Sequence, residues 1–379
     1  MQLAPLHHGD ETTTVTFGTV ALTNAGNGGY PGYDGFVWKM SADGTTLWAV
    51  GGGGKGYEVI GGIAVDGSNA VVAVGRFRRP AIFGGVALPT NRGGGGANDP
   101  VVWKMSADGT TLWAVRGGGT SDDELHGVAV DGAGAVVAAG FFKSSTSTFG
   151  GVELTNAGSA DAVVWKMSAD GTTLWAVRGG GLNDVYTKAI AVDGSNAVVV
   201  SGHFEDGTAT FGSVALTSTG NYDAVLWKMS ADGTTLWAVG GGGPGADRVD
   251  GVAVDAAGAT VTVGRLASST STFGGVALTT AGGEDAVVWK VSDVAGFTHC
   301  LNDVCSTPLS PFHLREHRET RAVRRWSPVC SCFQASLYIL LTVLTRLVPM
   351  SVRADCPRHY CHHPKQLPDG RGYMLGDAR

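Results

Sequence analysis

Few side chains in residues 17–293 of this 379-residue chain could do chemistry. Two imidazoles, His126 and His203, lie there, and neither accompanies a motif that would set a nucleophile beside a base. Acid–base or nucleophilic catalysis needs such a constellation of unlike residues at one place. The sequence therefore predicts a protein that is not an enzyme and that needs no cofactor or metal.

Two charged residue types recur at fixed places. Five lysines could form a ring that binds an anion, but the favoured interpretation is exposed lysines that shield the sheet surface: Lys39, Lys104, Lys166, Lys228 and Lys290. Four aspartates could contribute to calcium binding, but Ca²⁺ needs several oxygen ligands at close spacing, which these turns do not offer. Hydrogen bonding within Asx turns is the simpler explanation of this set: Asp66, Asp131, Asp193 and Asp255.

A third group of positions differs from copy to copy although the segments around it are nearly identical. Loops on a rigid scaffold carry function more often than strands do, so the sequence predicts the partner-binding residues here, while drift of exposed residues is the alternative. The predicted residues are Tyr57, Glu58, Asp122, Asp123, Glu124, His126, Asp184, Tyr186, Lys188, Asp247, Arg248 and Asp250.

The last 86 residues differ sharply from the rest and hold all six cysteines. Two groups there invite a metal interpretation, Cys300–Cys305–His313–His317 and Cys356–Cys361–His362–His363. Seven residues between the first two pairs leave no room for the hairpin and helix of a zinc finger. We expect residues 294–379 to form an irregular tail, disordered or foreign to the fold.

Internal repetition dominates the rest of the chain. The string WKMSADGTTLWAV begins at Trp38, Trp103, Trp165 and Trp227, and a fifth copy at Trp289 ends after WKVSD. A second marker, FGxVxL, recurs at Phe17, Phe83, Phe149, Phe211 and Phe273. Self-similarity at a fixed period is the signature of a repeat architecture. Residues 17–293 are thus predicted to be an array of about 62-residue repeats after a disordered leader at 1–16.

Each repeat reads as a four-stranded antiparallel sheet. Short apolar runs alternate with Gly or Asp turns, as in GVAVD, AVVAAGFF, DAVVWKM and TTLWAV between Gly127 and Val177. Ser168–Gly171 has the Asp-Gly chemistry of a hairpin turn. The runs are apolar almost without alternation, which is typical of strands covered on both faces. Because propeller blades stand between two other blades, the pattern favours an all-β, β-propeller fold of four to five blades in a ring that can be incomplete.

The tryptophans could be platforms for sugars, but their burial between sheets is the favoured interpretation. Burying one indole removes about 150–250 Å² from water. The predicted core tryptophans are Trp38, Trp48, Trp103, Trp113, Trp165, Trp175, Trp227, Trp237 and Trp289.

The unit GVAVDxxGxxVVAxG…DAVVWKMSADGTTLWAVRGGG resembles the bacterial β-propeller repeat called SBBP, and its GxAVDxxG part is similar to NHL-type blades. The resemblance covers residues 17–293 and implies a scaffold at the cell surface or outside the cell, generally without an assigned activity. It also implies that GVAVD, AVVAAGF, DAVVWKM and TTLWAV are strands a, b, c and d of a blade. The chain would then hold strands c and d of one blade, three whole blades (about 60–115, 125–177 and 187–239), and strands a, b and c of a last blade. Two features depart from the family: no secretion signal opens the chain, and residues 294–379 match nothing in it.

Charge and hydropathy limit the partners. The formal net charge is −6, with 11 basic and 6 acidic residues after position 293 and a net-negative array before it. Nucleic acid demands a basic face, so it is not an expected partner, and no apolar stretch reaches the roughly 20 residues of a spanning helix. The sequence predicts a non-catalytic scaffold that binds protein or glycan partners through the variable d-to-a loops. The alternative is a structural or adhesive surface repeat without a discrete site.

Overall fold

The computed structural model describes residues 6–8, 13–24, 32–90, 96–292 and 298–300. The chain divides into two compact units, Met1–Phe312 and His313–Arg379, and the second lies outside the described residues. Every regular element in the described ranges is a β-strand, and the named strands pair antiparallel. The prediction of an all-β chain with repeated antiparallel sheets is therefore confirmed. In the same ranges no helix is long and apolar enough to cross a membrane.

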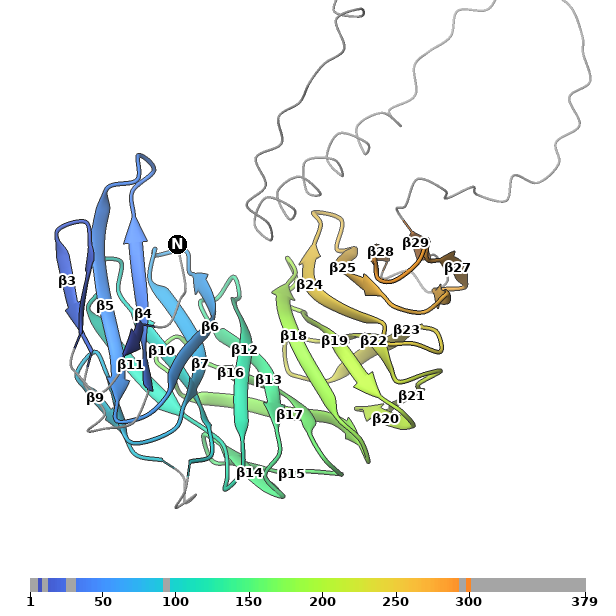
Figure 1. The fold of residues 1–379 in the computed structure, drawn as a ribbon, viewed down its shortest axis with the longest axis horizontal. Coiled ribbons are helices and arrows are strands. Elements are labelled where there is room, and N and C mark those ends of the chain that lie inside the picture. The colour runs from blue at the N-terminus through green and yellow to red at the C-terminus, as the bar shows by residue number, and fades with distance from the viewer. Residues whose placement is uncertain (1–5, 9–12, 25–31, 91–95, 293–297, 301–379) are drawn as a thin grey trace, which may run out of the picture. The chain divides into compact units, whose positions relative to one another are not determined.

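Each repeat forms a sheet in which strands a, b, c and d pair in chain order (Figure 1). Strand a is β6 (Glu58–Val65), β12 (Asp123–Val130), β18 (Val185–Val192) and β24 (Arg248–Val254). Strand b is β7 (Val71–Phe77), β13 (Val136–Phe142), β19 (Val198–Glu205) and β25 (Thr260–Leu266). Strand c is β4 (Gly32–Met40), β10 (Asp99–Met105), β16 (Asp161–Met167), β22 (Tyr222–Met229) and β28 (Asp285–Val291). Strand d is β5 (Thr46–Gly54), β11 (Thr111–Arg116), β17 (Thr173–Gly181), β23 (Thr235–Gly242) and β29 (Thr298–Cys300).

We number the sheets 1 to 5 by their c strands, β4, β10, β16, β22 and β28. In sheet 1, β1 (Leu6–His8) pairs with β4 in the place of strand b. In sheet 5, β29 pairs with β28 in the place of strand d, so the fourth strand comes from the segment predicted to be an irregular tail. Residues 301–379, with most of the cysteines and histidines considered as metal ligands, lie outside the described residues.

The c-to-d connection is the recurrent SADG turn. Gly171 there has a φ of +87°, which glycine adopts more readily than any residue with a Cβ. The Asp170 carboxylate accepts hydrogen bonds from the Ser168 hydroxyl and from the backbone N–H of Thr172. Equivalent bonds form in the other three copies. The polar side chains thus close the turn locally, as the sequence predicts.

The FGxVxL segment forms a hairpin between strands b and c that reaches back to the preceding sheet. The hairpins are β2 (Thr14–Phe17) with β3 (Val20–Thr23), β8 (Ala81–Phe83) with β9 (Val86–Leu88), β14 (Thr146–Phe149) with β15 (Val152–Thr155), β20 (Thr208–Phe211) with β21 (Val214–Thr217), and β26 (Thr270–Phe273) with β27 (Val276–Thr279). β8, β20 and β26 pair with the glycine-rich ends of β5, β17 and β23. Backbone bonds between Gly118 and Thr148 join β14 to the chain just after β11. Every sheet from 2 to 5 is thereby hydrogen-bonded to the one before it.

Aromatic side chains fill the space between successive sheets. The hairpin phenylalanine meets the c-strand tryptophan edge to face, as in Phe149–Trp165 with ring centroids 5.6 Å apart. The same pairing occurs at Phe83–Trp103, Phe211–Trp227 and Phe273–Trp289. Five of the predicted core tryptophans are buried: Trp48, and the fully buried Trp103, Trp165, Trp227 and Trp289. The other four are half-buried: Trp38, Trp113, Trp175 and Trp237.

Glycines in the last part of strand d, or directly after it, make room for these rings. A Cβ at Gly179 would lie 2.6 Å from a ring carbon of Phe211, too close for any real contact. Gly52, Gly117 and Gly241 face Phe83, Phe149 and Phe273 in the same way. The recurrent Gly-Gly-Gly of the sequence is therefore a packing requirement of the hairpin.

The prediction that the repeated lysines are exposed is wrong. Lys104, Lys166 and Lys228 are at most 4% exposed. Each pairs with the aspartate in the a-to-b turn of its own sheet, Lys166 with Asp131 at 2.8 Å, and the same pair forms in sheets 2, 4 and 5. Strands a and c lie on either side of strand b, so a long side chain on c can reach the turn that joins a to b.

The same aspartates close Asx turns, as predicted. Asp131 accepts hydrogen bonds from the backbone N–H groups of Ala133 and Ala135 with its other carboxylate oxygen. Burial raises the pKa of Asp131, but the hydrogen bonds from Lys166 and Ala135 lower it by more. The pKa therefore lies below its ordinary value. A carboxylate occupied in this way has no oxygens left to build a calcium site.

The lysine also bonds to the next sheet, together with the d-strand tryptophan. Lys166 Nζ and Trp175 Nε1 both donate to the carbonyl of Ala231 in the SADG turn of sheet 4, at 3.1 and 3.0 Å. Trp175 packs so closely on this turn that a Cβ at Gly233 would lie 2.9 Å from the indole. The carbonyls of Ala107 and Ala169 receive the same two donors from sheets 1 and 2. We call this recurrent contact the inter-sheet latch.

The sheets follow one another in chain order, and each packs on the next through its own hydrophobic cluster. Within the described residues, no sheet combines a strand of sheet 1 with a strand of sheet 5. A closed propeller ring therefore stays a prediction.

Replacing Gly179 with Ala tests the glycine requirement. We expect a loss of about 1–3 kcal/mol in the free energy of unfolding, because the added methyl overlaps Phe211. Gly194→Ala is the matched control, since a Cβ there meets nothing within 4 Å, and its effect should stay within about 0.5 kcal/mol. Equal losses in urea unfolding would contradict the packing argument.

Replacing Lys166 with Met tests the buried lysine–aspartate pair. The change leaves Asp131 buried without its cation, and removing one partner of a buried pair costs about 3–5 kcal/mol. Lys39→Met is the control, because half-buried Lys39 donates to the carbonyls of Asn69 and Ala107 and has no carboxylate partner in the described residues. Urea unfolding that shows the same loss for both variants would refute the role assigned to the pair.

Candidate functional site

The variable positions predicted to lie in d-to-a loops extend into strand a. Only Tyr57, Asp122, Asp184 and Asp247 precede the strand, and the other predicted residues are part of β6, β12, β18 or β24. The variable side chains therefore stand on neighbouring strands of sheets 2 to 5, where rigid elements position them.

A β-bulge explains why strand a can vary at one place. Its register shifts at the same point in all four sheets, and the extra residue is Gly61, His126, Lys188 or Asp250. A Cβ at Gly140 on strand b would overlap the backbone carbonyl of Glu124, and Gly75, Gly202 and Gly264 are equally crowded. The strand-b glycine thus permits the bulge, and a bulge frees a side chain from the alternation of the strand. Three of the predicted residues, His126, Lys188 and Asp250, occupy this position.

Three acidic residues predicted to bind partners do not face solvent. Glu58, Asp123 and Asp247 have no exposed surface, which corrects the prediction for them. Their carboxylates accept hydrogen bonds from the backbone N–H of Gly54, Gly119 and Gly243 at the end of strand d. They hold the d-to-a connection in place, and a buried acid that bonds to backbone is a structural element rather than a contact surface.

A polar network begins where sheet 2 meets sheet 3. Glu124 forms a salt bridge with Arg76, accepts a hydrogen bond from the Asn98 side chain at 2.9 Å, and lies 3.3 Å from His126 Nε2. The other ring nitrogen of His126 bonds to the carbonyl of Thr187 in sheet 4 at 3.0 Å. Burial raises the pKa of Glu124, but His126 and Arg76 lower it more, so the carboxylate is charged.

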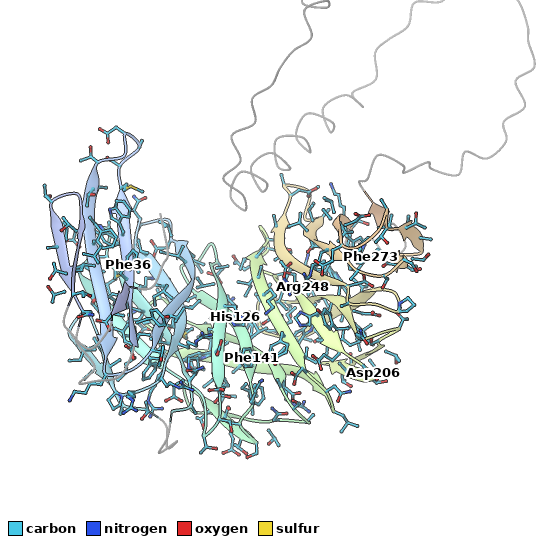
Figure 2. The ribbon with its side chains drawn as sticks, viewed as in Figure 1. Phe36, His126, Phe141, Asp206, Arg248 and Phe273 are labelled. Atoms are coloured by element: carbon cyan, nitrogen blue, oxygen red, sulfur yellow. The ribbon has the colours of Figure 1, made fainter. Side chains whose placement is uncertain are left out.

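Aromatic rings continue this network across sheets 3 and 4. Ring centroids are 5.5 Å apart for His126–Phe141, 4.7 Å for Phe141–Tyr186, 5.4 Å for Tyr186–His203 and 4.9 Å for His203–Tyr222. Figure 2 shows His126 on β12 beside Phe141 on β13, and labels Arg248 on β24. The rings form one continuous row from the bulge of sheet 3 to strand c of sheet 4.

Cations gather at the end of the row. Arg248 pairs with Asp250 at 3.1 Å, and Arg265 pairs with Glu284 at 2.6 Å. Lys188 has no ion-pair partner among the described residues and stands 5.3 Å over the ring of Tyr186. Burial, and to a smaller extent the charge of Arg248, lower the pKa of Lys188, although the charges of Asp250 and Glu124 oppose the shift.

His203 lies buried between these groups. It is 7% exposed, and its Nδ1 has no hydrogen-bond partner in the structure. Burial, Lys188 and Arg248 lower its pKa to about 3, so the ring is neutral at neutral pH. A buried polar atom without a partner is uncommon in native proteins. The arrangement offers a ligand three nitrogen-bearing groups, from Lys188, His203 and Arg248, between two tyrosines.

We call the connected set the a–b stripe: Arg76, Glu124, His126, Phe141, Tyr186, Lys188, His203, Tyr222, Arg248, Asp250 and Arg265. The strand-b members were missed by sequence reasoning. Arg76, Phe141, His203 and Arg265 each follow the conserved strand-b glycine of their repeat, and each is paired in register with the strand-a position Val59, Glu124, Tyr186 or Arg248. The sequence therefore did contain a signal for these residues. It is a second position that differs from repeat to repeat, directly after a glycine that all four repeats share.

The remaining predicted residues lie beside the stripe. Tyr57 contacts the ring of Tyr33 and the guanidinium of Arg78. Asp122 accepts a hydrogen bond from the backbone of Asn98, and Asp184 accepts one from the Tyr186 hydroxyl at 2.7 Å. They support neighbours of the stripe and form no separate site.

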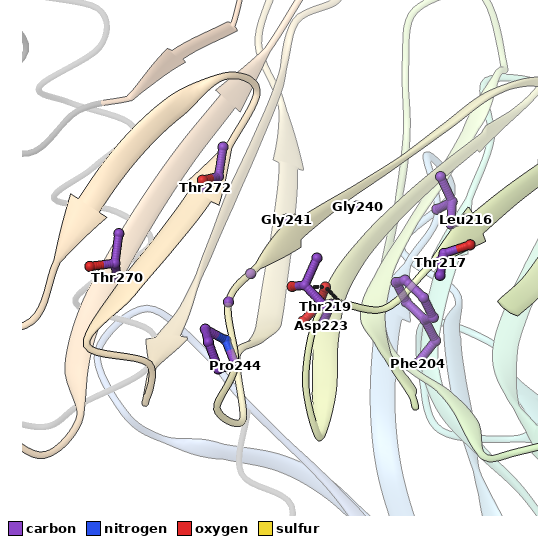
Figure 3. A pocket seen from close by; sticks show the side chains of 12 residues that line it. Phe204, Leu216, Thr217, Thr219, Asp223, Gly240, Gly241, Pro244, Thr270 and Thr272 are labelled. Atoms are coloured by element: carbon purple, nitrogen blue, oxygen red, sulfur yellow. Dashed lines mark hydrogen bonds between the residues drawn. The ribbon is translucent and has the colours of Figure 1, made fainter. Parts of the chain in front are cut away.

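A cleft of about 390 Å³ opens elsewhere, between β21, β23 and β26 (Figure 3). Gly240–Gly243 and the threonines of the two hairpins line it, and Asp223 there accepts hydrogen bonds from the backbone and hydroxyl of Thr219. None of the predicted partner-binding residues lines this cleft. Among the described residues, no group of three or more His, Cys, Asp or Glu side chains is placed to hold a metal ion.

The chain matches no known protein-family model and no curated protein. The resemblance to SBBP-type and NHL-type repeats accordingly stays a prediction from the sequence.

The buried carboxyl of Glu58 predicts a pH dependence of stability. Burial, with the charge of Asp34 adding to it, raises its pKa from 4.5 to about 8. Between these values the folded chain binds a proton that the unfolded chain releases, so stability falls as pH rises from about 4.5 to about 8. Glu58→Gln keeps an oxygen for Gly54 and cannot ionise. We expect it to flatten this part of the pH profile of urea unfolding. An unchanged profile would contradict the buried, protonated state of Glu58.

Proposed function

We propose that this chain is a non-catalytic scaffold of the β-propeller repeat type that binds a protein or glycan partner through the a–b stripe. The observation that carries the proposal is the contrast within each repeat. Residues of the inter-sheet latch are nearly identical from copy to copy, whereas the bulge position and its strand-b neighbours carry different polar and aromatic groups. In a purely structural array only drift of exposed residues would give that contrast, and Glu124 and His203 are at most 9% exposed.

The chemistry of the stripe favours a partner group that is anionic. Among the described residues, Lys188 has no ion-pair partner and His203 Nδ1 has no hydrogen-bond partner, and both lie beside Tyr186. Glu124 and Asp250 are already paired with Arg76 and Arg248. A carboxylate or sulfate placed between Lys188 and Arg248 would offset their mutual repulsion. The acid groups of a glycan or of a protein surface supply this chemistry.

Catalysis is not part of the proposal. The ring nitrogens of His126 both face oxygen atoms, of Thr187 and Glu124, and the low pKa of His203 leaves it a poor base. Within the described residues neither imidazole forms a hydrogen bond with a serine or threonine hydroxyl. The resemblance to cell-surface repeat families supports a place outside the cell.

The second candidate is a structural or adhesive spacer without a discrete site. The latch favours it, since this contact repeats between sheets with the same donors and the same acceptor carbonyl. A spacer gains nothing from the stripe and should not respond to substitutions there.

Binding to an array of neutral and uronic-acid-containing glycans tests the proposal. We expect the full chain to bind acidic glycans, and Lys188→Gln to weaken binding at least tenfold because it removes the unpaired cation. Exposed Lys55 lies outside the stripe, so Lys55→Gln is the control and should bind as the parent does. If array and pull-down on immobilised acidic protein both show no binding, or if Lys188→Gln binds unchanged, the spacer is favoured.

A further inference from the structure

Each contact between neighbouring sheets joins the same two surfaces. The outgoing face of a sheet consists of residues of strands b and c, the latch lysine and the d-strand tryptophan, as in Val137, Ala139, Val164, Lys166 and Trp175 of sheet 3. The incoming face of the next sheet consists of its c-strand tryptophan and methionine, its hairpin and the carbonyl of its SADG turn. Three contacts, of sheets 1 and 2, 2 and 3, and 3 and 4, have all of these parts and provide an internal standard. In the contact of sheets 4 and 5, Val291 replaces the methionine, and the c-to-d turn of sheet 5 lies outside the described residues.

The incoming face of sheet 1 lacks this covering within the described residues. Trp38 and Met40 are half-buried, although the same positions of the next three sheets, from Trp103 and Met105 onward, are fully buried. Gly44 in the SADG turn meets nothing within 4 Å, whereas Gly109, the equivalent glycine of sheet 2, lies under the indole of Trp48. The positions are chemically the same, so the difference reflects the missing neighbour.

The hairpin of sheet 1 also lacks the covering that the other hairpins have. Val15 is 37% exposed, while its equivalents Ala81, Ser147, Ala209 and Ser271 are at most 3% exposed. Those four lie in hairpins that bond to a preceding strand d or to the chain just after it, and β2 with β3 forms a separate two-stranded sheet. An apolar side chain is thus exposed at the edge where the fold elsewhere adds a strand.

The outgoing face of sheet 5 is open in the complementary way. Val261, Val263 and Val288 are half-buried, although their equivalents in sheets 2 to 4 are fully buried. Lys290 pairs with Asp255 as the other latch lysines pair with their aspartates. The described part of the chain therefore begins with an acceptor surface and ends with a donor surface that keeps the latch lysine, with His299 at the register position of the latch tryptophan.

We propose that these two faces dock on each other between two copies of the chain, head to tail. Among the described residues the two faces are not joined within one copy: sheets 1 and 5 share no strand pairing, and their residues belong to separate hydrophobic clusters. In the contact, Lys290 of one copy donates to the carbonyl of Ala42 of the other, and the valines of sheet 5 cover Trp38 and Met40. An interface between unlike faces adds copies in a ring or a filament. This proposal is independent of the a–b stripe.

Sedimentation velocity of the full chain over a wide concentration range tests the proposal. The parent chain should associate as concentration rises. Met40→Glu disables the incoming face and Val263→Glu the outgoing face, so each variant alone should stay monomeric. An equimolar mixture should form dimers and nothing larger, because each variant keeps one intact and complementary face.

Two further variants keep the outcome interpretable. Leu112→Glu changes a residue that is 54% exposed on strand d, outside both faces, and should associate like the parent. Val15→Glu alters the exposed hairpin, so it should also stay monomeric and form dimers with Val263→Glu. A parent chain that remains monomeric at every concentration, or single variants that still associate, would overturn the proposal.

Discussion

The structure depends on one recurrent contact, in which a buried lysine and an indole of one sheet donate to a single carbonyl of the next. The lysine is tolerated inside because the aspartate of its own a-to-b turn neutralises it, as burial of a charge requires. The carbonyl of Ala231 is held by a hairpin turn that its own side chains close. One motif, WKMSADGTTLWAV, therefore encodes the strand, the turn, the donors and the acceptor. Two consecutive copies of the motif therefore contain both donors and the acceptor of one latch.

The latch and the buried rings fix strands c and d and the hairpin of each repeat. Strand a and the adjoining positions of strand b are therefore free to differ. The strand-b glycine creates the bulge that releases a side chain from the sheet at the same height in every repeat. Four sheets in series then present four different residues along one line, with a second line from strand b beside it. Scaffold and proposed recognition surface are thus separate parts of the same repeat, and the surface can change without loss of the fold.

Local sequence signals predicted the strands, the hairpin turns and the Asx turns, because each depends on residues within a few positions of one another. Signals that act between repeats were missed. The lysines looked exposed because their partners, such as Asp131 and Ala231 for Lys166, are 35 and 65 residues away. Glu58, Asp123 and Asp247 looked like surface acids because their hydrogen-bond donors are backbone N–H groups of glycines, and no side chain in the sequence indicates such a partner. His203 was considered only as a catalytic imidazole, and Arg265 was not considered, because only the pairing of strands a and b brings them to the stripe.

The central claim is that neighbouring sheets are coupled through the latch. Hydrogen exchange by mass spectrometry on Trp175→Ala measures this directly, since Trp175 belongs to sheet 3 and bonds to the turn of sheet 4. The account predicts faster exchange in β22, β23 and the turn Ser230–Thr234 as well as in β17, because the lost indole uncovers the next repeat. Exchange that rises in sheet 3 alone, with sheet 4 as protected as in the parent chain, would contradict it.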